Sequence, residues 1–149
     1  MRAWMAVAAV AAMVVSATPA TADWQWTRWG MTEAEVVAAS GGRAVPHDGG
    51  NQWLLRIHGP YKVGTTNFDN VSFRFTAGGL SAISMMAGAD DFESLERQIT
   101  ASVGAPVGAG GGRTAFRTWI DREKGNSIEL QVISDAVFLE YTPVTKAEF

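Results

Sequence analysis

The chain contains only two histidines and no cysteine, the side chains that most often hold zinc or act as nucleophile and base. Its two histidines, His47 and His58, fall in a predicted turn and a predicted strand. A zinc site needs about three protein ligands in tight geometry, and two histidines so placed do not supply it. We therefore expect exposed histidines and no metal site.

Carboxylates occur together at Asp90, Asp91 and Glu93, where a pair of acids could carry out general acid–base catalysis. They stand directly before an apolar helical pattern, a position in which acidic side chains cap a helix and interact favourably with its dipole. The chain has no cysteine and no G-x-S-x-G motif, so few nucleophiles are available. The sequence predicts a protein that is not an enzyme and has no cofactor. A hydrolase with an unrecognised site is the less favoured alternative.

The glycine-rich stretch 108–113 could be mistaken for a phosphate-binding loop. It lacks the G-x-x-x-x-G-K-[S/T] order, and a strand pattern follows it where such a loop would lead into a helix. We expect a flexible loop over residues 108–112.

Tryptophan supplies the first candidate binding residues. Trp24, Trp26 and Trp29 lie close together in the sequence, and tryptophan is enriched at the centres of protein interfaces. Such a cluster either contacts a partner or a sugar, or covers the end of a small core and fixes the N-terminal segment; the second interpretation is favoured. Trp53 and Trp119 fall on predicted strands, where we expect them in the core or on a sheet face.

A second candidate binding surface follows from strand alternation. Arg56 and His58 lie on the same side of one predicted strand, and Arg74 lies on the polar side of the next. Together they could line a sheet face that binds an anion, although solvent-exposed side chains without a ligand are the favoured interpretation.

The first 22 residues have the pattern of a signal peptide. Arg2 gives a short basic start, residues 4–15 are apolar, and Ala20-Thr21-Ala22 supplies small residues for cleavage after Ala22. The alternatives are an uncleaved anchor or a buried N-terminal helix. We expect a periplasmic or secreted protein with a single domain over residues 23–149 and no span in the mature chain.

The charge of the chain argues against nucleic-acid binding. The formal net charge is −3, and it becomes −4 once Arg2 is removed. A mildly acidic domain without a basic block lacks the positively charged surface that binds a phosphate backbone. We expect the partner to be another envelope protein or a peptide.

Two helices are predicted from capping and periodicity. Thr32 followed by Glu35 forms a capping box, which predicts a helix over residues 33–40. Asp90 or Asp91 caps the second helix, whose apolar residues recur at helical spacing as far as residue 103.

Period-two alternation predicts antiparallel strands, as where Val71, Phe73 and Phe75 share one side. Gly78-Gly79 fits a two-residue turn, and a change of parity in the returning strand predicts a bulge near Ser81-Ala82. The predicted strands cover residues 43–46, 52–58, 61–63, 68–76, 80–87, 113–121, 127–133 and 136–142, with an interruption at Gly59-Pro60. The predicted class is α+β, with two helices packed on one face of an antiparallel sheet of about six to seven strands, arranged as two α–β repeats.

The order of these elements resembles a family of small exported bacterial domains built from tandem helix-plus-antiparallel-sheet units. That family includes the β-lactamase inhibitory protein and the outer-membrane assembly lipoprotein BamE (SmpA). The residues that carry the resemblance are Trp29-Gly30-Met31-Thr32 with Glu35-Val36, Phe73-x-Phe75 with Gly79-Leu80, and Val103-Gly104-x-Pro106. The resemblance implies protein binding and assigns no functional residue.

The function expected from the sequence is therefore that of a soluble periplasmic protein without catalysis. It would bind a protein or peptide through a sheet face or exposed loops. The alternative is a carrier of a small ligand or lipid that uses the concave side of the sheet.

Overall fold

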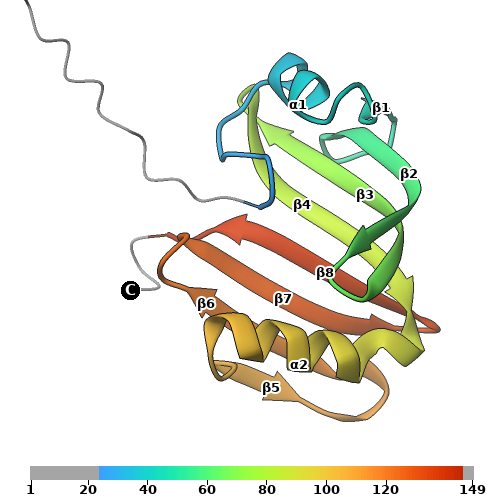
Figure 1. Cartoon of the computed structure of the whole chain (residues 1–149), viewed down its shortest axis with the longest axis vertical. Coiled ribbons are helices and arrows are strands. Elements are labelled where there is room, and N and C mark those ends of the chain that lie inside the picture. Colours follow the sequence, from blue (N-terminus) through green and yellow to red (C-terminus); the bar gives the residue numbers. More distant parts are fainter. Residues whose placement is uncertain (1–23, 146–149) are drawn as a thin grey trace, which may run out of the picture.

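One antiparallel sheet dominates the computed structural model, which describes residues 24–145. The predicted signal peptide and its cleavage site lie outside the described residues. The sheet has eight strands in the order β1-β2-β3-β4-β8-β7-β6-β5 (Figure 1). Within residues 24–145, no helix has the length and apolar character needed to cross a membrane.

Each half of the sheet is a helix followed by a four-stranded meander, and the two meanders join through β4 and β8. The first half consists of α1 (Glu33–Ala39), β1 (Val45–Pro46), β2 (Trp53–Val63), β3 (Thr66–Thr76) and β4 (Gly79–Gly88). The second half consists of η1 (Ala89–Asp91), α2 (Phe92–Val103), β5 (Gly108–Gly110), η2 (Gly112–Thr114), β6 (Phe116–Asp121), β7 (Asn126–Ile133) and β8 (Ala136–Pro143). The join pairs six residues of each strand, from Ile83 opposite Tyr141 to Gly88 opposite Ala136.

The expected α+β class with six to seven strands is wrong, because the described part of the chain forms eight strands and only two short α-helices. One missed strand is β5, which the sequence analysis assigned to a flexible loop. A Cβ atom at Gly108 would meet the side chain of Thr118, and one at Gly110 would meet the ring of Phe116. This strand therefore requires glycine, which leaves no side-chain alternation from which it could be predicted.

The predicted interruption at Gly59-Pro60 is also wrong, since β2 continues through it to Val63. The pairing of β2 with β3 shifts in register between His58 and Tyr61 at this point. The β3 backbone lies so close to Gly59 that a Cβ atom there would meet the carbonyl of Asp69. Strand β2 therefore continues to Val63 through a shift in register, because Gly59 has no Cβ atom and so permits this close approach.

Helix α1 begins as the capping box predicts. The backbone N–H of Glu35 donates to Oγ1 of Thr32 at 3.2 Å, and the N–H of Thr32 donates to Oε2 of Glu35 at 2.8 Å. Helix α2 begins differently, because Asp91 occupies the N-cap position without a capping hydrogen bond from its side chain.

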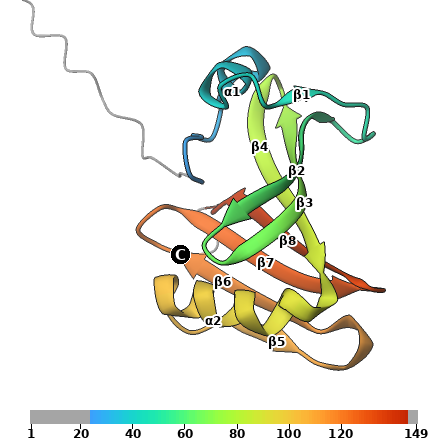
Figure 2. The same cartoon turned by 45° about the vertical axis from the view of Figure 1, so that its right-hand side comes forward.

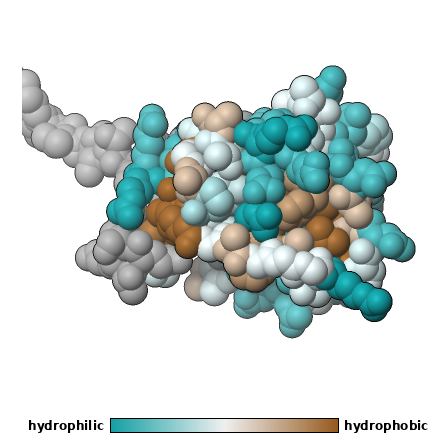
Figure 3. Space-filling model, turned by 90° about the horizontal axis from the view of Figure 1, so that it is seen from below, coloured by the Kyte–Doolittle hydropathy of each residue, from teal (hydrophilic) through white to brown (hydrophobic). Residues whose placement is uncertain are grey.

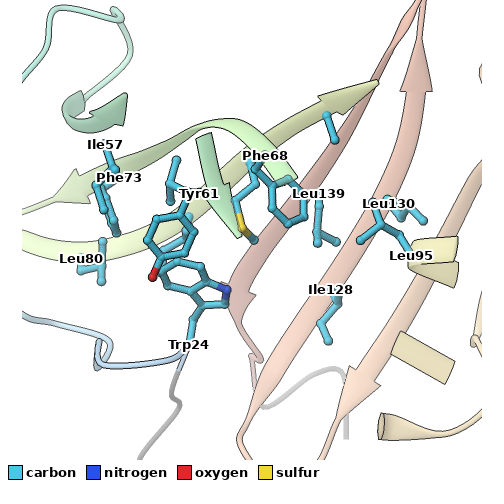
Figure 4. Packing of buried hydrophobic residues seen from close by; sticks show 14 of the residues in the cluster. Trp24, Ile57, Tyr61, Phe68, Phe73, Leu80, Leu95, Ile128, Leu130 and Leu139 are labelled. Carbon is cyan, nitrogen blue, oxygen red and sulfur yellow. The ribbon is translucent and has the colours of Figure 1, made fainter. Parts of the chain in front are cut away.

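The core lies along one face of the sheet, which we call the inner face. Helix α2 packs over β6 and β7 on this face, and the segment that precedes α1 also lies against it (Figures 1 and 2). The strands contribute alternate residues, so the packing follows the predicted period-two pattern. Figure 4 shows part of this cluster gathered between the two halves of the sheet, including Trp24, Tyr61, Phe68, Phe73, Leu95, Ile128, Leu130 and Leu139.

Candidate functional site

The opposite side of the sheet, which we call the outer face, carries the other alternate residues of the strands. Buried residues of both helices join the core on the inner face, and the structure places neither helix over the outer face (Figure 2). Cross-strand pairing lines up two rows on this face. The first row is Arg56, Ser72, Ser84, Glu140, Glu129 and Thr118, and the second is His58, Asn70, Met86, Phe138, Gln131 and Phe116.

The structure brings Arg56, His58 and Arg74 together on the outer face of β2 and β3. The Nε atom of Arg56 donates to Oγ of Ser72 at 3.0 Å. The guanidinium of Arg74 lies over the ring of Trp53, 5.3 Å from the ring centroid. His58 is exposed and pairs across the strands with Asn70. Anion binding by these residues stays a prediction.

A hollow of about 300 Å³ opens between these strands on the outer face. Trp53 and Arg56 line it from β2, while Met86 and Phe138 line it from the central strands β4 and β8. Gly49, Asn70, Ser72 and Ser84 complete the lining. Met86 and Phe138 could not be recognised from the sequence, because half-buried apolar residues on a polar strand side resemble ordinary core residues there.

Two glutamates give the other half of the outer face an acidic character. Glu140 of β8 pairs directly with Glu129 of β7. Burial raises the pKa of Glu140 above its ordinary value of 4.5; Arg74 opposes this change and Glu129 adds to it. The outer face is therefore cationic over β2 and β3 and anionic over β7 and β8.

The Glu140→Gln variant is expected to be more stable than the unmodified protein at about pH 7, by about 0.5 kcal/mol, because it removes a charge that burial disfavours and that also repels Glu129 across the strands. The pKa of Glu140 is higher in the folded than in the unfolded state. The contribution of the Glu140 carboxyl to the free energy of unfolding is therefore fully present below its unfolded-state pKa and is lost as the pH rises through its folded-state pKa. The advantage of the variant should thus disappear at about pH 4, which urea unfolding at both pH values measures.

Glu123→Gln is the matched control, since Glu123 is exposed in the turn between β6 and β7. An equal gain in stability from Glu123→Gln would show that net charge, and not the Glu129–Glu140 pair, sets the effect.

The three N-terminal tryptophans lie on the inner side of the sheet, away from Arg56, His58 and Arg74. Trp24 is 4% exposed, and its ring centroid is 5.8 Å from that of Tyr61. Half-buried Trp26 donates from Nε1 to the hydroxyl of Tyr61 at 3.2 Å, and Trp29 donates from Nε1 to Oδ1 of Asn126 at 2.9 Å. The two predicted groups of binding residues therefore do not form one site.

A second hollow, which we call the inner cleft, opens on this inner side and measures about 240 Å³. Helix α2, the β2–β3 turn, Trp24 and the adjoining ends of β6, β7 and β8 enclose it. Its polar lining includes Asp121, Lys124 and Tyr141. The sequence carries no sign of this group, because the three residues come from two strands and a turn that only the sheet order brings together.

The structure shows no metal centre among residues 24–145, where no group of three histidine, aspartate or glutamate side chains could hold an ion. An ion pair joins Nε of Arg117 to Oε1 of Glu96 at 2.7 Å and connects β6 to α2.

Comparison of the chain with protein-family models, with curated proteins and with solved structures found no match.

Proposed function

We propose that the protein is a non-catalytic binding module whose outer face binds another protein or a peptide. One observation carries the proposal: a hollow of about 300 Å³ lined by tryptophan, arginine, methionine and phenylalanine lies on a sheet face that no described helix covers. These are the residue types enriched at protein interfaces.

The hollow suits an anchor side chain of the partner. Binding energy at an interface is concentrated where a large side chain enters a pocket that excludes water. Trp53 and Phe138 are both half-buried, so each keeps apolar surface that an anchor could cover. Half-buried Met86, which is flexible and apolar, lies between them and can adapt to the shape of the anchor.

The charges around the hollow favour one orientation of the partner. Arg56 and Arg74 lie on the β2–β3 side, and Glu140 and Glu129 lie on the β8–β7 side. A partner with acidic residues before its anchor and basic residues after it, or the reverse order along an antiparallel path, would meet opposite charges at both ends. We expect that partner to be an envelope protein or peptide, because the N-terminal sequence predicts export. The resemblance noted in the sequence implies the same class of function.

Photo-crosslinking tests this proposal. A photo-crosslinking phenylalanine at position 138 places the reactive group in the hollow. The same group at position 107 is the control, since Val107 is 66% exposed and follows the end of α2 in the chain. We expect discrete crosslinked products from position 138 in the native envelope and none of these from position 107.

A charge reversal sharpens the result. Arg56→Glu should abolish the products from position 138, whereas Lys62→Glu, an equal change at an exposed residue of the same strand, should leave them unchanged. Melting temperatures confirm that both variants fold. Identical products from positions 138 and 107, or products that survive Arg56→Glu in a folded variant, would contradict binding through the outer face.

A further inference from the structure

The inner cleft has the size of a small-molecule site, and both apolar and polar side chains line it. It lies on the other side of the sheet from the proposed protein-binding face. Its volume of about 240 Å³ exceeds the 150 Å³ or so that admits a benzene molecule to an apolar protein cavity. Figure 3 views the molecule from below and shows apolar residues reaching the surface in two separate areas divided by hydrophilic side chains. A cleft of about 240 Å³ can take one compact apolar group without a change in the fold.

Apolar side chains form the floor of the inner cleft. Trp24, Phe68 and Met85 line it from the first half of the chain, and Ile128 and Leu139 line it from the second (Figure 4). All five are at most 4% exposed, so they belong to the packed core and hold a fixed shape. The part of a ligand that enters first must be apolar.

Asp121 and Tyr141 are two of the polar residues that line the cleft. They lie on the same inner face on either side of β7, where Asp121 pairs with Asn126 and Tyr141 pairs with Ile128. Asp121 is 9% exposed, and its Oδ1 accepts a hydrogen bond from the backbone N–H of Lys124 at 3.0 Å. This hydrogen bond fixes the carboxylate at the end of the apolar floor.

The hydroxyl of Tyr141 has no hydrogen-bond partner among residues 24–145. A half-buried phenol ordinarily finds one. Burial, together with the charge of Asp121, raises the pKa of Tyr141 to about 12, so the hydroxyl stays neutral at physiological pH. Its oxygen is therefore able to accept a hydrogen bond from a ligand.

These two oxygens select the polar group of the ligand. A buried carboxylate and a phenol oxygen that line the same cleft offer acceptors to an N–H donor, and the negative charge favours a donor that is cationic. Lys124, which also lines the cleft, is exposed and flexible, so its ammonium can turn into solvent while Asp121 stays fixed. We infer that the inner cleft binds a small primary amine with an apolar or aromatic body, its ammonium held by Asp121 and Tyr141.

Calorimetric titration of the purified protein with 2-phenylethylamine tests this inference, with 3-phenylpropionate as the matched anion. We expect the amine to bind at millimolar concentrations or below and the carboxylate to bind at least about tenfold more weakly. Equal or tighter binding of 3-phenylpropionate would show that Lys124 governs the cleft and would overturn the amine class. Absence of binding by the amine at these concentrations would overturn the site.

Substitutions locate the binding. Asp121→Asn keeps the shape and the acceptor for the N–H of Lys124 and should weaken amine binding at least about tenfold. Asp135→Asn, an equal change in the exposed β7–β8 turn, should have no effect. If Asp121→Asn does not fold, Tyr141→Phe removes the hydroxyl alone and should also weaken the amine. Unchanged affinity in a folded Asp121→Asn or Tyr141→Phe protein would contradict the assignment. Loss of amine binding would leave the outer-face crosslinks intact, so the two proposals fail separately.

Discussion

The Trp119→Ala variant is expected to lose about 3–5 kcal/mol of unfolding free energy, the range typical of a buried tryptophan replaced by alanine. Trp119 is 0% exposed and lies on β6 beneath α2. Its Nε1 donates to Oγ1 of Thr100 at 3.2 Å, so the substitution empties a large volume and removes a link between helix and sheet. Because small domains are stable by only about 5–15 kcal/mol, urea unfolding should show a protein close to the limit of folding.

Two controls follow: the first separates the loss of volume from the loss of the hydrogen bond, and the second tests the position of the core. Trp119→Phe keeps most of the apolar contact and should cost less than Trp119→Ala. Trp53→Ala removes the same side chain from the half-buried outer face, where water can fill the space, and should also cost less. A loss from Trp53→Ala as large as that from Trp119→Ala would contradict the placement of the core on the inner face.

Trp24→Ala is expected to cost about 3 kcal/mol, near the lower end for a buried tryptophan, because the segment before α1 can adjust more than a central strand. The Trp24 ring lies 6.0 Å from the Trp26 ring and 6.3 Å from the Phe73 ring, measured between centroids. Its removal exposes the apolar floor of the inner cleft as well as these rings. Thermal and urea unfolding measure the loss.

Arg28→Ala, at an exposed residue of the same segment, is the control and should leave stability unchanged. The crosslinked products from position 138 should survive Trp24→Ala, since Trp24 lies on the inner side of the sheet. A folded Trp24→Ala protein of normal stability that has lost its partner would instead make Trp24 a binding residue.

Local patterns in the sequence predicted much of the sheet. Val71, Phe73 and Phe75 alternate as predicted, and all three are buried. The predicted bulge near Ser81-Ala82 is confirmed, because Arg74 pairs with Ala82 and Phe75 pairs with Leu80, which leaves Ser81 as the extra residue. Alternation and parity are properties of a single strand, so they can be read without its neighbours.

Features that depend on neighbouring strands could not be predicted. The strand at Gly108–Gly110 exists because its glycines fit over Thr118 and Phe116, a condition set by β6 and invisible in the segment itself. The same holds for the sites. Arg56 and His58 could be placed on one face from their spacing, whereas the approach of Asp121 to Tyr141 depends on β6 and β8 both pairing with β7.

The join between β4 and β8 sets the order in which the sheet can be completed. β8 is the last strand of the described chain, yet it lies in the middle of the sheet between β4 and β7. Pairing Ile83 with Tyr141 closes a long loop, whose entropy cost is offset only when the whole strand is in place. A chain still being synthesised therefore cannot close its sheet before Pro143 has been made. Until then β4 and β7 each present an unpaired edge, so both edges can pair with a strand of another chain until β8 covers them.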